Sequence, residues 1–413
     1  MKFDKSETFA HCHRVAGLAR RTGAVMGLSP DVESAIAIAA SLHHVCGPDF
    51  RAGRLTSFFE DLPELAAAKP ADNEVLALAG GILERFLGHG SSPGAIVQTG
   101  ASILEAANEF DEAVEFGALE GTPAAEAIRE FHEESRALSG IGDPRSALCH
   151  ATAPARFTPA PDHLPILPRA AFRLMHTSDE TAPAMLESIV ALDPVLAGRL
   201  LEAANSARFG PPQPITRLAD AASRVGVPLA RRILLAACFG EVFASASLRV
   251  VWLNSQRIAE RASALARRAK LDPGEAWVAG LLHDVGRIVF ERAGADSRIR
   301  LAGWIESGFP LTYAEALTWS KDHTGTGAEL LGAWELPDSI IEAVRHHHHP
   351  ERSRSPMASL LYLAEQWHAE TFGPESAFEL FHDMRSHCAS ERTGISAADL
   401  RRVDVSSHAM AAG

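Results

Sequence analysis

With 413 residues, the chain is too long for one ordinary hydrophobic core, so we expect two domains joined by a linker. Hydrophobic residues make up 46% of it and charged residues 22%, which excludes a disordered or fibrous protein. The net charge of -13 at pH 7 argues against broad nucleic-acid binding, because the phosphates would be repelled.

The five cysteines are scattered along the chain and never form a C-x-x-C pair. This pattern indicates free thiols in a reducing compartment, not a disulfide framework or a zinc ribbon. The start, MKFDKSETFAHCHRV, has no apolar run of signal-peptide length. The most apolar long run, 233–253, is interrupted by Glu241 and Arg249, so we expect no membrane span and a cytoplasmic protein.

Apolar residues recur with helical spacing through almost the whole chain, whereas the alternation typical of strands is nearly absent. The sequence therefore predicts an all-α protein made of two helical bundles. The stretch 140–168 is rich in Pro, Ala and Gly and lacks periodicity, which is typical of a linker. The predicted parts are a first domain at 1–139, a linker at 140–163, a second domain at 164–390 and a tail at 391–413.

Capping residues predict where helices of the second domain begin. Asp193 and Asp272 each precede a proline, so they are expected N-caps with the proline at the first helical position. Asp338 is the expected cap of a later helix. Gly286 is expected to end the helix that follows Asp272.

Six ordered segments of the second part carry a family resemblance. They are LPILPRAAFRLM, IVALDPVLAGRLLEAANSARFG, PITRLADAASRVGVPLARRILLA, AWVAGLLHDVGRIVF, DHTGTGAELLGAWELP and AVRHHHHPE. Together they make the region from Leu164 to Glu370 resemble the HDOD family, bacterial signalling domains within the HD-domain superfamily of metal-dependent phosphohydrolases. The turn ANSARFG is the most distinctive of these features.

The first part resembles the opening helices of an HD or HD-GYP domain in HCHRVAGLARRTGAVMGLS and AIAIAASLHHV, and its late helix in GASILEAANEFDEAV. In this resemblance His11 stands at the first ligand position, His43 and His44 at the His-Asp pair, and Asn108 at the final aspartate. The first domain is therefore expected to be a degenerate HD-like domain. Because no carboxylate is placed to complete a site with them, these histidines and His13 are interpreted as structural or solvent-facing.

The resemblance implies a metal site in the second domain. It assigns His283 and Asp284 to the central pair, His323 to the next histidine, His347 and His348 to the following His-His pair, and Glu365 to the final aspartate. Imidazole and carboxylate ligands of this kind suit a divalent Fe, Mn or Zn ion, which activates water and neutralises phosphate.

Two departures weaken this ligand set. Asn254 stands where the first histidine is expected, and a neutral amide oxygen is a poor substitute for imidazole on a transition metal. Glu365 carries one methylene more than the expected aspartate. One of two ion positions is therefore damaged, whereas the ligands of the other are all present. The sequence predicts a single divalent ion at most and leaves its occupancy open.

Simpler interpretations remain open. His283 and Asp284 could form a hydrogen bond at a helix end, and the histidines 346–349 could offset a helix dipole without any ion. Arg287 is either a phosphate contact beside the metal or a surface arginine.

The favoured hypothesis is a bacterial signal-transduction protein that binds a signalling protein or a nucleotide-like ligand in the old active-site cleft, without efficient turnover. The alternative is a metal-dependent phosphohydrolase acting on a nucleotide or cyclic dinucleotide. A third alternative is a scaffold whose histidines bond one another. A homodimer is left open.

Overall fold

The structure is a computed structural model of the chain, and every regular element in its described part is a helix, as predicted. The described residues are 5–44, 46, 51–52, 55, 73–89, 94–119, 122–138, 142–154, 168–177, 180–191, 193–240, 242–243, 245–366, 384–396 and 399–400. No described helix is long and apolar enough to cross a membrane. The chain divides into two compact units, Met1–Phe157 with Gly294–Asp322 and Thr158–Ala293 with His323–Gly413.

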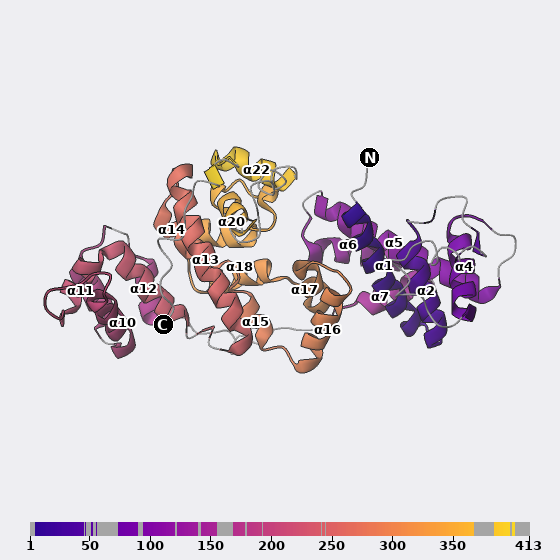
Figure 1. The fold of residues 1–413 in the computed structure, drawn as a ribbon, viewed down its shortest axis with the longest axis horizontal. Coiled ribbons are helices and arrows are strands. Elements are labelled where there is room, and N and C mark those ends of the chain that lie inside the picture. The colour runs from indigo at the N-terminus through magenta and orange to yellow at the C-terminus, as the bar shows by residue number, and fades with distance from the viewer. Residues whose placement is uncertain are drawn as a thin grey trace. The chain divides into compact units, whose positions relative to one another are not determined.

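Unit 1 is a helical bundle around one apolar core. Its helices are α1 (Lys5–Val25), α2 (Pro30–Leu42), α4 (Asn73–Phe86), α5 (Ala95–Leu119), α6 (Ala124–Leu138), α7 (Pro144–Thr152), α16 (Ala295–Glu306) and α17 (Leu311–Trp319) (Figure 1). Helices α1, α2 and α5 pack against one another, and α4 packs on α2 and α5. Helices α1, α2 and α5 each bury an apolar face in the core, which includes the fully buried side chains of Leu18, Ile36 and Phe110.

Helices α16 and α17 complete the core of unit 1, although they come late in the sequence. The Trp304 side chain is fully buried, and the Arg21 guanidinium lies 4.1 Å from the centroid of its ring. His13 Nε2 donates a hydrogen bond to the Glu306 carbonyl oxygen at 2.9 Å. These contacts fasten the α16–α17 hairpin to α1.

Unit 2 holds the remaining helices. They are α8 (Arg169–Met175), α9 (Pro183–Val190), α10 (Pro194–Asn205), α11 (Leu218–Val225), α12 (Val227–Gly240), α13 (Ala246–Ala269), α14 (Pro273–Leu282), α15 (Arg287–Glu291), α18 (His323–Ala333), α19 (Asp338–Arg345), η4 (Pro350–Arg352), α20 (Pro356–Gln366) and α22 (Met384–Thr393). The long helices α13 and α14 touch backbone to backbone, since a Cβ on Gly280 would lie 2.7 Å from the Ala259 Cα.

Two of the three predicted caps are confirmed. The Asp193 carboxylate accepts from the first free backbone N–H groups of α10 at 3.0 and 3.1 Å. Asp272 accepts from the backbone N–H of Glu275 at 2.6 Å. The third cap is wrong by one residue, because Pro337 occupies the N-cap position and Asp338 is the first helical residue.

Two segments differ from the predicted domain boundaries. The expected linker 140–163 contains α7, which packs against α1 and α5. The expected second domain 164–390 contributes Gly294–Asp322 to unit 1. Both segments carry fully buried apolar side chains, Leu148 in α7 and Leu317 in α17, and their burial draws these helices into the bundle.

Candidate metal centre

Four helices of unit 2 bring the predicted metal ligands together. His283 directly follows α14, His323 begins α18, His347 and His348 follow α19, and Glu365 lies in α20. Helix α19 packs against α14, α18 and α20, and α14 also packs against α20. The predicted ligands are therefore gathered at the ends of helices that touch one another.

A close backbone contact brings His323 to Asp284. A Cβ on Gly286 would lie 2.1 Å from the His323 carbonyl oxygen and 2.6 Å from the Gly327 nitrogen. Only glycine fits such a separation from backbone atoms, so α18 can approach the turn after α14. His323 Nε2 consequently lies 3.3 Å from Asp284 Oδ1. The helix before Gly286 ends at Leu282, earlier than predicted.

The other imidazoles converge on the same place. His323 Nε2 lies 3.0 Å from His348 Nε2, and His348 Nδ1 lies 3.3 Å from Glu365 Oε2. One ring nitrogen from each of His323, His347 and His348 falls within 4.8 Å of the others. The rings of His283 and His347 meet edge to face with centroids 5.3 Å apart.

Backbone carbonyls fix the tautomers of two rings. His283 Nδ1 donates to the Gly280 carbonyl oxygen at 2.8 Å, and His347 Nδ1 donates to that of Val344 at 2.6 Å. A neutral ring that donates through Nδ1 keeps a lone pair on Nε2. Both Nε2 atoms are buried and have no hydrogen-bond partner within the described part of the chain. An unsatisfied buried acceptor costs about 1–3 kcal/mol, and a coordinated cation would remove that cost.

The charges in the cluster suit a cation. Burial favours the neutral form of Asp284, but His283 and His323 hold the pKa of this carboxyl well below its usual range. Burial lowers the pKa of His347 well below 6.5, and the neighbouring His348 lowers it further. Near neutral pH the cluster thus presents a carboxylate and a neutral imidazole, the forms that bind divalent metals.

Arg287 lies at the edge of the cluster. Its Nη1 is 3.2 Å from Asp284 Oδ2, and about a third of its side chain is exposed. A guanidinium in this position can also contact a phosphate, so the predicted role of Arg287 remains a prediction. Asn254, which stands at the expected first histidine, is half-buried in α13.

The four consecutive histidines 346–349 have two kinds of surroundings. The middle two belong to the cluster. His346 Nε2 lies 3.6 Å from Glu342 Oε1, and His349 Nδ1 lies 3.1 Å from Glu351 Oε1. The outer two therefore pair with carboxylates outside the cluster.

One prediction about unit 1 is wrong. His11 Nδ1 lies 2.8 Å from Asp111 Oδ2, so a carboxylate does accompany the N-terminal histidines. Asp111 is buried on α5, three residues after Asn108. Residues spaced by three share a helix face, so this spacing was the signal that could have identified the carboxylate.

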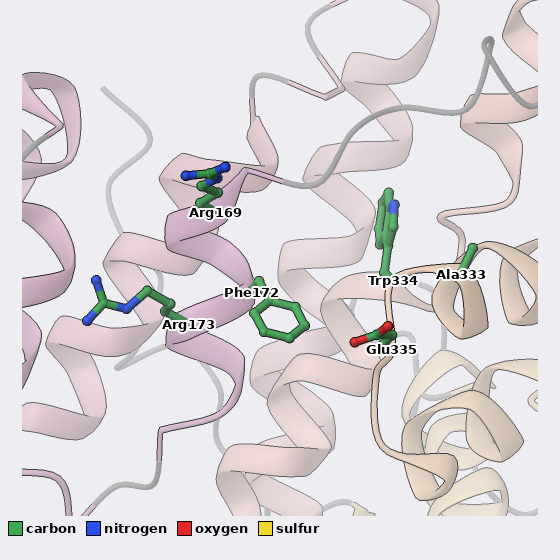
Figure 2. Close-up of a pocket in the computed structure, with 6 residues that line it drawn as sticks. All are labelled: Arg169, Phe172, Arg173, Ala333, Trp334 and Glu335. Atoms are coloured by element: carbon green, nitrogen blue, oxygen red, sulfur yellow. The ribbon is translucent and has the colours of Figure 1, made fainter.

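A pocket of about 440 Å³ also lies in unit 2 (Figure 2). Its lining comes from α8 and from the end of α18 with the turn that follows: Arg169, Phe172, Arg173, Ala333, Trp334 and Glu335. Figure 2 shows the Phe172 ring pointing toward Glu335, while the Arg173 guanidinium points away. Because His323 begins α18, the cluster and this pocket lie at opposite ends of that helix, about 15 Å apart along its axis.

Comparison with known proteins gives relatives for the second part. Residues 164–350 match the family model of the HDOD domain. An uncharacterized protein of Treponema pallidum (strain Nichols) is 26% identical over 245 residues, which cover 56% of this chain and 48% of that protein. Ribonuclease Y of Aquifex aeolicus (strain VF5) is 30% identical over 115 residues, which cover 28% of this chain and 16% of that protein. The matched region spans less than half the length of either curated relative.

Among solved structures, an HDOD domain protein from Geobacter sulfurreducens is similar to this chain with a TM-score of 0.50 and 20% sequence identity. The similarity covers 57% of this chain and 87% of that one. It shows the helical fold that the sequence resemblance implied.

Proposed function

We propose that the protein is a regulatory, signal-transduction protein, on the premise that its residues 164–350 form an HDOD domain. Its second domain holds one divalent ion, of Fe, Mn or Zn, between His283, Asp284, His323, His347 and His348. Regulation follows from binding an anionic ligand at that ion, not from fast turnover.

The pair of buried Nε2 atoms on His283 and His347 is the observation that carries this proposal. Their Nδ1 atoms are bonded to backbone carbonyls, so both rings are held with a lone pair available. Such outer contacts orient metal-binding histidines in proteins. The nearby Asp284 supplies negative charge, and His323 supplies a third imidazole.

A phosphate-bearing ligand fits the charge of this centre. Neutral imidazoles do not neutralise the positive charge of a divalent ion. The negative charge of Asp284 is already partly neutralised by its ion pair with Arg287. A phosphate oxygen can meet both the ion and the guanidinium, which favours a nucleotide-like ligand. A phosphorylated or acidic segment of a partner protein offers the same chemistry. Competition experiments with free nucleotide distinguish a nucleotide-like ligand from such a protein segment.

The metal content of untagged full-length protein tests the proposal. We expect His323→Ala and Asp284→Ala each to hold one equivalent of metal less than the wild type. His346→Ala is the matched control, because His346 pairs with Glu342 outside the cluster. Equal metal content in His323→Ala and wild-type protein, with unchanged circular dichroism, would contradict the site.

Hydrolysis of phosphodiesters is the second candidate function, and the position of Arg287 beside Asp284 favours it. A bound ion lowers the pKa of water and stabilises charge on phosphate. The test is cleavage of a panel of nucleotides and cyclic dinucleotides under metal-replete, anaerobic conditions. Cleavage that Asp284→Ala abolishes establishes the enzyme, whereas no cleavage by metal-loaded protein removes it.

A further inference from the structure

We propose that unit 1 contains a second, independent site for a transition-metal ion of the zinc class, formed by His11, His43, His44 and Asn108. These residues come from α1, the end of α2 and α5, which pack against one another. The site does not depend on the proposed function of unit 2.

Three donor atoms of this cluster face one another. His11 Nε2 lies 3.2 Å from His43 Nε2 and 3.1 Å from Asn108 Oδ1. His43 Nε2 lies 3.0 Å from the same Asn108 oxygen. Donor atoms around a tetrahedral Zn²⁺ ion, with Zn–N distances of about 2.0–2.1 Å, lie about 3.3 Å apart. The three atoms therefore have nearly the mutual spacing of one coordination sphere.

The hydrogen bonds around the cluster turn these lone pairs toward its centre. His43 Nδ1 donates to the Ala40 carbonyl oxygen at 2.6 Å, and His11 Nδ1 donates to Asp111 Oδ2 at 2.8 Å. Asn108 Nδ2 donates to Glu112 Oε1 at 2.8 Å, which leaves its Oδ1 pointing inward. Burial opposes the charged form of His11, but the hydrogen bond to Asp111 raises the pKa of this ring, so a metal ion competes with a proton for His11 Nε2. Once that proton leaves, two imidazole nitrogens and an amide oxygen are three acceptors in contact. A single cation can satisfy all three at once.

Asp111 supports the site from outside. It is 1% exposed, and besides His11 it accepts from Arg14 Nε and Nη2, each at 2.8 Å. A carboxylate held in this way fixes the ring that it contacts, as carboxylate–histidine pairs do behind metal ions. His11 and His43 are themselves buried, so the geometry is fixed by packing as well as by hydrogen bonds.

His44 supplies the more accessible ligand. One of its ring nitrogens lies within 4.8 Å of nitrogens of His11 and His43, and its side chain is exposed. Three imidazoles favour zinc, copper or nickel over magnesium or calcium, which prefer sites made of oxygen atoms, and the amide oxygen of Asn108 is a weaker fourth ligand.

Metal binding by full-length protein with the unit 2 cluster disabled tests this inference. In an untagged Asp284→Ala/His323→Ala background we expect one equivalent of Zn²⁺ after loading and desalting. Cobalt-loaded protein should show the visible absorption of tetrahedral Co²⁺. Adding His43→Ala should remove both signals, and adding Asn108→Ala should weaken both. His150→Ala, an exposed histidine of α7, should leave them unchanged.

The outcomes separate the two sites. If the background variant binds no zinc, or if Asn108→Ala and His43→Ala bind as much as it does, the second site is wrong. If His43→Ala loses its helical circular dichroism, the exposed His44→Ala provides the same test. Wild-type protein that binds one equivalent and keeps it in the Asp284→Ala/His323→Ala background supports this site and contradicts the metal centre of unit 2.

Discussion

Gly286 and Gly327 determine how closely α18 can approach the turn that carries Asp284. Their backbones are in contact, with the ideal Cβ position of Gly327 only 3.2 Å from the Gly286 nitrogen. Because the neighbouring atoms are backbone, they cannot move aside by changing rotamer. Two residues without functional groups therefore set the distance between two predicted metal ligands.

We expect Gly286→Ala to separate His323 from Asp284 and to destabilise unit 2. The added methyl would lie 2.1 Å from the His323 carbonyl oxygen, and overpacking of this kind costs about 1–3 kcal/mol or more. Denaturant unfolding and metal content of the variant measure both effects. Gly332→Ala, on α18, is the control, since a Cβ there meets nothing within 4 Å. Equal stability and metal content in the two variants would contradict the role of Gly286.

At the level of residues, the order of motifs predicted the candidate ligands of unit 2, and the fold brings these residues close together. It did not reveal that His283 and His347 are held by carbonyls of their own turns, because tautomers depend on backbone geometry. Asp111 was missed for another reason. Its spacing of three from Asn108 indicated a shared helix face, but its contact with His11, about a hundred positions earlier, depends on the packing of α1 on α5.

At the scale of elements, helix starts with local signals were predictable, whereas the partners of each helix were not. Asp193 and Asp272 cap their helices because the signal lies within a few residues. The α16–α17 hairpin shows ordinary helical spacing, and such spacing does not indicate which core its apolar face will join. Its assignment to the second domain was therefore a natural error.

Trp304 is the residue through which the hairpin should contribute most to unit 1. It is fully buried, and the Arg21 guanidinium stacks over it. We expect Trp304→Ala to destabilise unit 1 by about 3–5 kcal/mol. Hydrogen exchange should show the loss of protection in α1 as well as in α16. Ile299→Ala is the control, because this side chain of α16 is 71% exposed. Protection in α1 that is unchanged by Trp304→Ala would show that the hairpin adds little.

At the scale of the whole molecule, unit 1 is assembled from two distant stretches of sequence. A fragment of residues 1–157 lacks Trp304, Phe309 and Leu317, which belong to its core. We expect this fragment to melt at a lower temperature and with less cooperativity than unit 1 in the full chain. Circular dichroism melting with and without an added peptide of residues 294–322 measures the effect. A fragment that melts like the full-length protein would show that the hairpin is dispensable.

In the sequence, the α16–α17 hairpin lies between two predicted ligands of one ion, since Asp284 precedes it and His323 follows it directly. An ion held by both residues would tie the ends of this segment together, as a disulfide closes a loop. Such a cross-link lowers the entropy of the unfolded hairpin more than that of its folded form. Metal taken up by one unit would in this way strengthen the fold of the other through the connectivity of the chain alone.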